Sequence, residues 1–335
     1  MPSFTLYIGG QVMKLSVVIP YYQDERIKGL ITMLKKQTLS KNEFNVLIVD
    51  DFSKKPLKIE DLDIEDLNVK IYRLDKNYGA GLARAKGLYE CDSEYITFID
   101  SDDLIFDYTL KDLLDNIGDC DILASNFIEE HKKDGELVGI QHIEDKTWMH
   151  GKLYKVSYLK ENHINFHPYL RYNEDGYFNT IAFACTTKIM LLNKATYLWQ
   201  NNQNSTVRKN GCEYNFIHFI DYIKSQEYAC YNLYKRDNEH LMDIALGVLF
   251  YIYYYLTALK KWKTTKYKKY YDECINEFKK FYSMFGDLIK YCPYDRLCAI
   301  FSISRAKVEN GRFIERLTFK QFIKGLGLKS YKQFD

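Results

Sequence analysis

The chain has 335 residues, of which 47% are hydrophobic and 27% charged, and its formal net charge is +2. This composition is globular, with enough length for one large domain or two smaller ones, and near neutrality excludes a global attraction to nucleic acid. Residues 260–335 hold 18 Lys and Arg against 8 Asp and Glu, which leaves 29 and 37 for residues 1–259. An acidic body with a basic tail suggests two separate tasks.

The cysteines and the longest apolar stretch indicate a cytoplasmic chain. The eight cysteines form no Cys-x-x-Cys pair and no Cys/His cluster at zinc spacing, so we interpret them as reduced thiols. Residues 1–13 resemble a leader but lack the basic and apolar regions of a signal peptide. The stretch 244–259 is 16 residues long and rich in Tyr, which favours a buried helix over a membrane span.

The apolar pattern predicts alternating strands and helices from residue 15 to residue 100. The expected strands are 15–20, 44–51, 69–75 and 94–100, and the expected helices are 24–38 and 79–91. These lengths and this order predict an α/β layer with a largely parallel sheet. From about residue 237 a helical pattern rich in Tyr and Lys continues to the end. We therefore expect a leader (1–13), a catalytic domain (14–236) and a helical, basic C-terminal region (237–335).

Two of the predicted strands end in acid, at Asp50-Asp51 and in "DSDD" (100–103). In open parallel sheets ligands bind beyond the carboxyl ends of the strands, and crowded carboxylates repel each other. A divalent cation relieves that repulsion, and oxygen ligands suit Mg²⁺ or Mn²⁺, which bridge to substrate phosphates. The alternative that "SDD" is a solvated turn with a helix-capping Asp stays open.

Five segments resemble, in order and spacing, those of the family 2 glycosyltransferases, which have a GT-A fold. They are "LSVVIPYYQDE" (15–25), "VLIVDDFS" (46–53), "NYGAGLARAKGL" (77–88), "EYITFIDSDD" (94–103) and "WMHGKLYKVSYLKENHINFHPYLRYNEDGYF" (148–178). The likeness covers roughly residues 14–210. It implies a Rossmann-like, mostly parallel sheet flanked by helices, followed here by a helical C-terminal region.

The resemblance also implies a donor site at the strand ends. In the opening loop, which includes Pro20, Tyr22 would stack on the nucleotide base, and Asp51 would bind the uracil edge. The segment "DSDD" (100–103), called the acid turn below, would contact the ribose or the metal through Asp100 and Ser101. The resemblance places further donor contacts in the glycine-bearing segment (77–88). Arg84 would approach the base or diphosphate, and Asn77 and Gly79 would also bind the donor. By itself, "GAG" (79–81) indicates either a nucleotide-binding backbone or a plain helix start.

Metal binding and catalysis are assigned by the same resemblance. Asp102 would ligate Mn²⁺ or Mg²⁺, and Asp103 would orient the turn. Asp175 would be the general base, supported by Glu174. A mobile loop near "NQNSTVR" (202–208) would close over the diphosphate with contacts from Ser205 and Arg208. The sequence departs from the family at Lys86, where Asn is common, and at His150 in "WMHGK", where a tighter Trp-Gly-Lys is common.

These roles suit the transfer of a sugar with inversion. A cation stabilises the leaving diphosphate, and a placed carboxylate takes the acceptor proton. We expect a nucleotide-sugar donor, and among these a UDP-sugar with a hexosyl or N-acetylhexosaminyl group. The expected acceptor is a hydroxyl of a bacterial surface polysaccharide, teichoic-acid-like polymer or glycolipid. Two alternatives stay open: a phage-type transferase acting on modified DNA, and a non-catalytic nucleotide-sugar-binding module.

The basic stretch "KKWKTTKYKKYY" (260–271) has three interpretations. It is a solvated helix face, a peripheral contact with the inner face of the membrane, or a nucleic-acid contact. A homo-oligomer is also compatible with the sequence.

Overall fold

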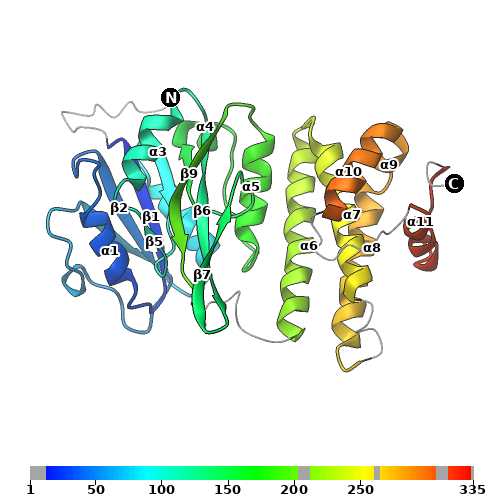
Figure 1. The fold of residues 1–335 in the computed structure, drawn as a ribbon, viewed down its shortest axis with the longest axis horizontal. Coiled ribbons are helices and arrows are strands. Elements are labelled where there is room, and N and C mark those ends of the chain that lie inside the picture. The colour runs from blue at the N-terminus through cyan, green and yellow to red at the C-terminus, as the bar shows by residue number, and fades with distance from the viewer. Residues whose placement is uncertain (1–12, 203–211, 260–264, 307–315, 333–335) are drawn as a thin grey trace. The chain divides into compact units, whose positions relative to one another are not determined.

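The computed structural model describes residues 13–202, 212–259, 265–306 and 316–332. The chain folds into two compact units. The first unit comprises residues 1–171 and 185–203, and the second comprises residues 172–184 and 204–335. Figure 1 shows the sheet of the first unit and the helices of the second.

The first unit is built on a sheet of nine strands among the described residues. Four of them are parallel neighbours in the order β3 (Val69–Arg73), β2 (Phe44–Asp50), β1 (Leu15–Tyr21) and β4 (Tyr95–Phe98). The sheet continues through β8 (Lys152–Lys155), β6 (Ile122–Lys133), β9 (Ile189–Trp199) and β5 (Leu104–Ile105). Here β4–β8, β6–β8 and β5–β9 are antiparallel pairs, and β7 (Glu136–His142) forms an antiparallel hairpin with β6.

Every residue of β1 and β2 is buried, because helices cover both faces of these parallel strands. One core joins Leu15, Val17 and Ile19 of β1 to the apolar faces of α1 (Ile27–Lys35) and α3 (Thr109–Ile117). Val18 points to the other face, where α2 (Ala80–Glu90) packs. A Cβ atom on Gly87 of α2 would lie 2.3 Å from Val18 Cγ1, so this close approach requires glycine. The remaining helical segments are η1 (Ile59–Asp61) and α4 (Val156–Glu161).

The second unit consists of helices throughout its described residues. They are α5 (Glu174–Ala184), α6 (Cys212–Lys235), α7 (Leu241–Leu259), α8 (Lys268–Phe285), α9 (Leu288–Tyr291), α10 (Tyr294–Ala306) and α11 (Arg316–Gly325). The apolar faces of α6 to α11 share one aromatic-rich core around α7, whose Leu249, Phe250 and Tyr253 are fully buried, and α5 packs on α6. Among the described residues, no helix combines the length and apolar character that a membrane crossing requires.

The architecture confirms the predicted α/β GT-A class with a helical C-terminal region, with two differences in detail. The sheet is mixed, because β8 runs antiparallel to β4 and to β6, and β7 runs antiparallel to β6, whereas β6 and β9 are again parallel. The division between the two units also runs through the segment 14–236, since α5 and α6 pack together and Phe216, Phe219 and Ile223 belong to the helical core. The functional boundary at residue 236 stays a prediction, and residues 1–12 of the expected leader lie outside the described residues.

Candidate active site

The carboxyl ends of β1, β2 and β4 meet at one edge of the sheet, because these strands are parallel neighbours. Tyr21 at the end of β1 pairs with Asp50 at the end of β2, and the backbone N–H of Asp51 donates to the Tyr21 carbonyl at 2.8 Å. Pro20 is buried within β1, whereas Tyr22 just beyond it is 46% exposed. This edge therefore gathers the predicted base-stacking tyrosine and both acidic segments.

The first acidic segment is fully engaged in holding the fold. Asp50 accepts hydrogen bonds from the backbone N–H of Ser53 at 2.8 Å and of Leu57 at 3.3 Å, and it pairs with Arg73 at 2.6 Å. It is 1% exposed. Its two carboxylate oxygens are thus committed to the loop after β2 and to β3.

Asp51 fixes the glycine-bearing segment. Its carboxylate accepts hydrogen bonds from the backbone N–H groups of Tyr78 and Gly79, both at 2.7 Å. Burial raises the pKa of Asp51 above its ordinary value, and these two hydrogen bonds oppose that rise. Gly79 precedes α2 with φ +96°, a conformation that favours glycine. The structure therefore gives Asp51 a positioning task, and its predicted contact with the uracil edge stays a prediction.

Asn77 and Arg84 connect this segment to its surroundings. Asn77 donates to the Asp51 carbonyl at 3.1 Å and accepts from the Arg171 guanidinium at 2.7 Å. Arg84 lies on α2, is buried, and donates from Nη2 to Asp100 Oδ1 at 2.5 Å. Although burial opposes ionisation, the Arg84 guanidinium keeps the pKa of Asp100 below its ordinary value. Arg84 thus stabilises the ionised form of Asp100; its reach to the donor stays a prediction.

The acid turn follows β4 and is anchored to β9. Asp103 is buried and accepts from the Tyr197 hydroxyl at 2.6 Å and from the backbone N–H of Gln200 at 2.9 Å. The Tyr197 hydroxyl also accepts from the backbone N–H of Asp100 at 3.2 Å. Burial, together with the neighbouring carboxylates, raises the pKa of Asp103 well above its ordinary value. This arrangement agrees with the expected role of Asp103 in orienting the turn.

Asp102 faces outward from this turn next to a cation of the β1–α1 loop. Its Oδ2 accepts from Asn202 Nδ2 at 3.0 Å and lies 3.3 Å from Arg26 Nη2. Burial and the charge of Asp100 raise the pKa of Asp102 above its ordinary value. The side chains of Asp100 and Asp102 remain 28% and 27% exposed. Oxygen ligands that repel each other and stay accessible fit a hard divalent cation. Ser101, between them, is buried.

His150 adds a nitrogen to the inner side of the turn. Asp100, Asp103 and His150 each offer a ligand atom within 4.8 Å of the others. The imidazole is buried in aromatic side chains, with ring centroids 4.5 Å from Tyr197 and 5.1 Å from Phe127. Burial lowers the pKa of His150 to about 3, which keeps it in the neutral form that binds metals. The segment is held by Gly151 (φ +64°), whose Cβ atom would meet Ser125 Oγ at 2.4 Å.

The predicted base belongs to the second unit. Glu174 and Asp175 form the first turn of α5, are partly exposed, and follow Asn173, which has φ +55°. Asp175 Oδ1 accepts from the backbone N–H of Gly176 at 2.8 Å. The catalytic role of Asp175 stays a prediction. Ser205 and Arg208 lie outside the described residues.

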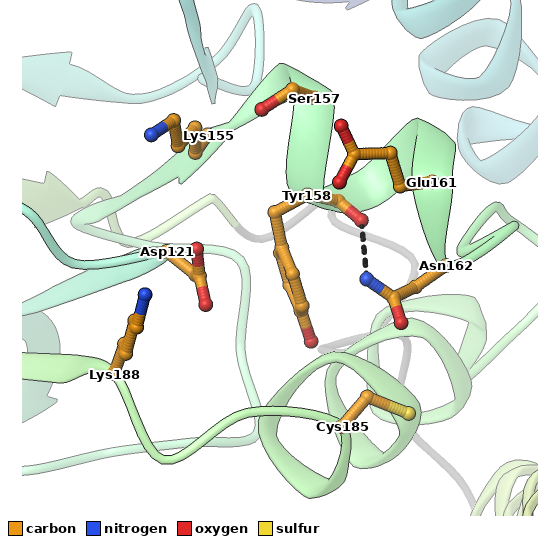
Figure 2. A pocket seen from close by; sticks show the side chains of 8 residues that line it. All are labelled: Asp121, Lys155, Ser157, Tyr158, Glu161, Asn162, Cys185 and Lys188. Atoms are coloured by element: carbon orange, nitrogen blue, oxygen red, sulfur yellow. Dashed lines mark hydrogen bonds between the residues drawn. The ribbon is translucent and has the colours of Figure 1, made fainter.

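The pocket in Figure 2 lies at a different part of the first unit. It has a volume of about 440 Å³, and Asp121 before β6, Lys155 at the end of β8 and Lys188 before β9 line it. Because β8 runs antiparallel to β4, these positions lie toward the sheet edge opposite the acid turn. Among the described residues, none of the predicted site residues lines this pocket.

A comparison of the chain with known families decides its class. The profile of Glycosyl transferase family 2 matches residues 16–196, more than half of the chain. The chain is a family 2 glycosyltransferase. The match confirms the resemblance inferred from the five segments, and with it the expectation that this family 2 transferase is a glycosyltransferase.

The transferase is similar to enzymes that are named for adding sugars to poly(ribitol phosphate). It is 30% identical over 214 residues to poly(ribitol-phosphate) beta-N-acetylglucosaminyltransferase TarS of Staphylococcus aureus, which covers 56% of this chain and 35% of that protein. It is 27% identical over 262 residues to a poly(ribitol-phosphate) beta-glucosyltransferase of Bacillus spizizenii, which covers 68% of this chain and 33% of that protein. The chain thus spans about a third of the length of these relatives.

A solved structure supports the fold of the transferase. The crystal structure of S. aureus TarS 1-349 in complex with UDP-GlcNAc matches with a TM-score of 0.67 at 24% identity, covering 93% of this chain and 92% of that chain. At this identity the likeness concerns the fold alone.

Five residues around the acid turn escaped sequence-based assignment. Arg26, His150, Tyr197, Gln200 and Asn202 touch or adjoin Asp100, Asp102 or Asp103. His150 had a signal, because "WMHGK" departs from the tighter family motif. Asn202 also had a signal, because it begins the segment "NQNSTVR" (202–208), which resembles the loop that closes over the diphosphate. Arg26, Tyr197 and Gln200 lie in loops and a strand whose local pattern carries no chemical signature.

Proposed function

We propose that this enzyme transfers a sugar from a UDP-sugar to a hydroxyl of a poly(polyol phosphate) wall polymer, with inversion and with a divalent cation. The observation that carries the proposal is the acid turn at the carboxyl edge of β4, beside the predicted base-binding residues Tyr22 and Asp51. The names of the relatives support the polymer, and the UDP-GlcNAc complex of TarS supports the donor class.

The donor would lie along this edge of the sheet. Tyr22 is exposed and offers its ring to the base, while Asp51 and Gly79 hold the backbone that faces the nucleotide. The divalent cation, held by Asp102 with Asp100 beside it, would neutralise charge on the leaving diphosphate. Arg84 keeps Asp100 ionised for that task.

The transfer step would be a single displacement at the anomeric carbon. The acceptor oxygen forms the new bond to that carbon, and the bond to the phosphate oxygen breaks with its electron pair leaving on UDP. The acceptor proton passes to the Asp175 carboxylate, and Glu174 supports it. One base opposite the leaving group gives inversion of the anomeric configuration.

The acceptor would be anionic, which suits the basic tail. Residues 260–335 hold 18 Lys and Arg against 8 Asp and Glu. In the described part of this region Lys266, Lys268 and Lys269 are exposed, and Lys269 lies 4.4 Å from the Tyr270 ring centroid. We propose that this region locates the polyanionic acceptor or an anionic membrane surface and takes no part in bond-making.

The test incubates the pure enzyme with UDP-GlcNAc or UDP-glucose, with poly(ribitol phosphate) as acceptor, and with Mn²⁺, Mg²⁺ or EDTA. We expect UDP release and a matching mass increase of the polymer, both lost with EDTA. Transfer with EDTA present would overturn the metal requirement. Parallel arms with glycolipid vesicles and hydroxymethylated duplex DNA test the other acceptors, and sugar on DNA alone would overturn the polymer. UDP-sugar binding without release would indicate a non-catalytic binding module.

A charge reversal tests the tail. The triple variant Lys266→Glu, Lys268→Glu, Lys269→Glu should leave UDP-sugar hydrolysis unchanged and raise the KM for the polymer a few-fold, more at low salt where screening is weak. Loss of hydrolysis in the folded variant would contradict a role restricted to acceptor location.

A further inference from the structure

The loop between β1 and α1 brings a guanidinium to the acid turn. Arg26 is anchored on Asp24, with Nε donating to Oδ1 at 2.8 Å and Nη2 donating to Oδ2. The backbone N–H of Arg26 also donates to Asp24 Oδ1 at 3.0 Å. From this anchored position Nη2 lies 3.3 Å from Asp102 Oδ2. The guanidinium therefore stands beside a carboxylate that the fold already crowds with Asp100.

Carboxylates outnumber guanidinium groups around the acid turn. Three carboxylates, Asp100, Asp102 and Asp103, follow β4, and Asp24 approaches from the neighbouring loop. Arg84 is committed to Asp100 at 2.5 Å. Asp102 forms an ion pair with Arg26, and Asp24 and Asp102 both contribute to raising the pKa of Arg26. Arg26 thus supplies positive charge that offsets Asp102.

We propose that Arg26 occupies Asp102 in place of the divalent cation until the nucleotide arrives, so that tight metal binding requires UDP. This inference rests on the proposed metal-dependent transfer. A guanidinium and a divalent cation a few ångströms apart repel each other, and the repulsion weakens metal binding to the nucleotide-free enzyme. The diphosphate brings negative charge that attracts both cations, which relieves the competition. Metal and nucleotide then strengthen each other's binding by the same factor.

Mn²⁺ titrations followed by the electron paramagnetic resonance of free Mn²⁺ test the proposal without turnover. The variant Arg26→Gln should bind Mn²⁺ about 3- to 10-fold more tightly than wild type in the absence of UDP. UDP should then improve Mn²⁺ binding by a correspondingly smaller factor. The variant Arg26→Lys keeps the charge and should stay close to wild type, which separates charge from shape.

The matched control is Lys35→Gln at the other end of α1. Lys35 also bridges two carboxylates, at 2.7 Å from Asp63 and 2.5 Å from Glu65, and its removal changes the net charge equally. Mn²⁺ binding to this variant should match wild type. A rise equal to that of Arg26→Gln would mean that net charge alone sets the affinity, and would overturn the proposal.

The outcomes separate this inference from the proposed function. If wild type binds no Mn²⁺ even with UDP, the metal-dependent function fails. If wild type shows the UDP effect and Arg26→Gln is unchanged or binds Mn²⁺ more weakly, the inference alone fails. Should Arg26→Gln not fold, Asp24→Asn tests it from the other side. The released guanidinium pairs more fully with Asp102, so the UDP-dependent improvement should grow; an unchanged improvement would overturn the proposal.

Discussion

The two acidic strand ends look alike in sequence and differ in what surrounds them. After β2, Asp50 and Asp51 are buried and their oxygens accept short hydrogen bonds from backbone N–H groups and from Arg73. After β4, Asp100 and Asp102 are partly exposed, and their carboxylates face each other and two guanidinium groups. The carboxylates after β2 bind backbone donors of the fold, whereas those after β4 stay partly exposed next to one another.

The difference shows how to tell a structural acid from a ligand-binding acid. Backbone donors stabilise an ionised carboxylate and leave little need for a cation. A carboxylate whose pKa is raised by burial and by a neighbouring carboxylate gains when a cation arrives. Burial raises the pKa of both Asp51 and Asp102, but two backbone N–H groups oppose the rise at Asp51, whereas the charge of Asp100 adds to it at Asp102. Asp102 is therefore of the second kind. Activity and stability should therefore respond in opposite ways to changes at the two ends.

The largest effect is expected at Asp102. Asp102→Ala removes the proposed metal ligand, so turnover should fall by at least about 10³-fold, as expected when a cation's several kcal/mol of transition-state stabilisation is lost. UDP affinity should no longer rise with added Mn²⁺, which isothermal calorimetry measures. A variant whose UDP affinity responds to Mn²⁺ as in wild type would remove Asp102 from the metal site.

The next largest effect is expected at Asp175, the predicted general base in the second unit. Asp175→Asn keeps the size and most hydrogen bonding of the side chain and cannot accept the acceptor proton. Its kcat should fall by about 10²–10⁴-fold, while UDP and Mn²⁺ affinities stay near wild type. Glu174→Gln is the matched control and should cost less. If Asp175→Asn transfers sugar within a few-fold of wild type, Asp175 is not the base.

Asp50 should show the reverse behaviour. Asp50→Ala removes hydrogen bonds to Ser53, Leu57 and the Arg73 guanidinium, so the free energy of unfolding should fall by about 1.5–3 kcal/mol. Urea denaturation followed by tryptophan fluorescence measures this change. The Mn²⁺ response of UDP binding per folded molecule should persist. A stable Asp50→Ala enzyme without that response would break the distinction between the two strand ends.

The most gradual effect is a pH dependence of stability carried by His150. The folded enzyme keeps this imidazole neutral down to about pH 3, whereas the unfolded chain protonates it below its ordinary pKa of 6.5. Between these values the unfolded state binds one more proton, so stability is present above pH 6.5 and is lost as the pH falls. His150 should contribute about 1.4 kcal/mol per pH unit to that loss.

The variant His150→Phe keeps an aromatic ring without a titrating group, and isolates this contribution. Below pH 6.5 its unfolding free energy should depend less steeply on pH than that of wild type. Trp148 and Trp199 lie beside His150, so their fluorescence reports the unfolding of this region. Parallel curves for the two proteins between pH 5 and 7.5 would contradict a buried neutral imidazole.

Much of the first unit follows from local sequence. The runs at 15–20, 44–51 and 69–75 form β1, β2 and β3 because continuous apolar or alternating side chains suit a covered sheet, and 79–91 forms α2 behind its glycine. The segments ending in Asp51 and Asp103 identified the family and the sheet edge that carries the acids. These features were predictable because strand formation and strand-end chemistry depend on neighbouring residues.

The partners of those acids were decided by the tertiary structure alone. Tyr197 and Gln200 reach Asp103 across 94 and 97 residues, Asn202 reaches Asp102 across 100, and Arg26 arrives from the first loop of the sheet. The tertiary structure also decided two larger features. These are the antiparallel pairing of β8, β6 and β7, and the packing of α5 and α6 within the helical unit. Periodicity records which face of an element is buried but not which distant element covers it. The pKa of a carboxylate depends on every charge and donor that folding brings near. Local sequence therefore located the acids at the strand ends, whereas the tertiary structure determined which of them hold the fold and which stay accessible.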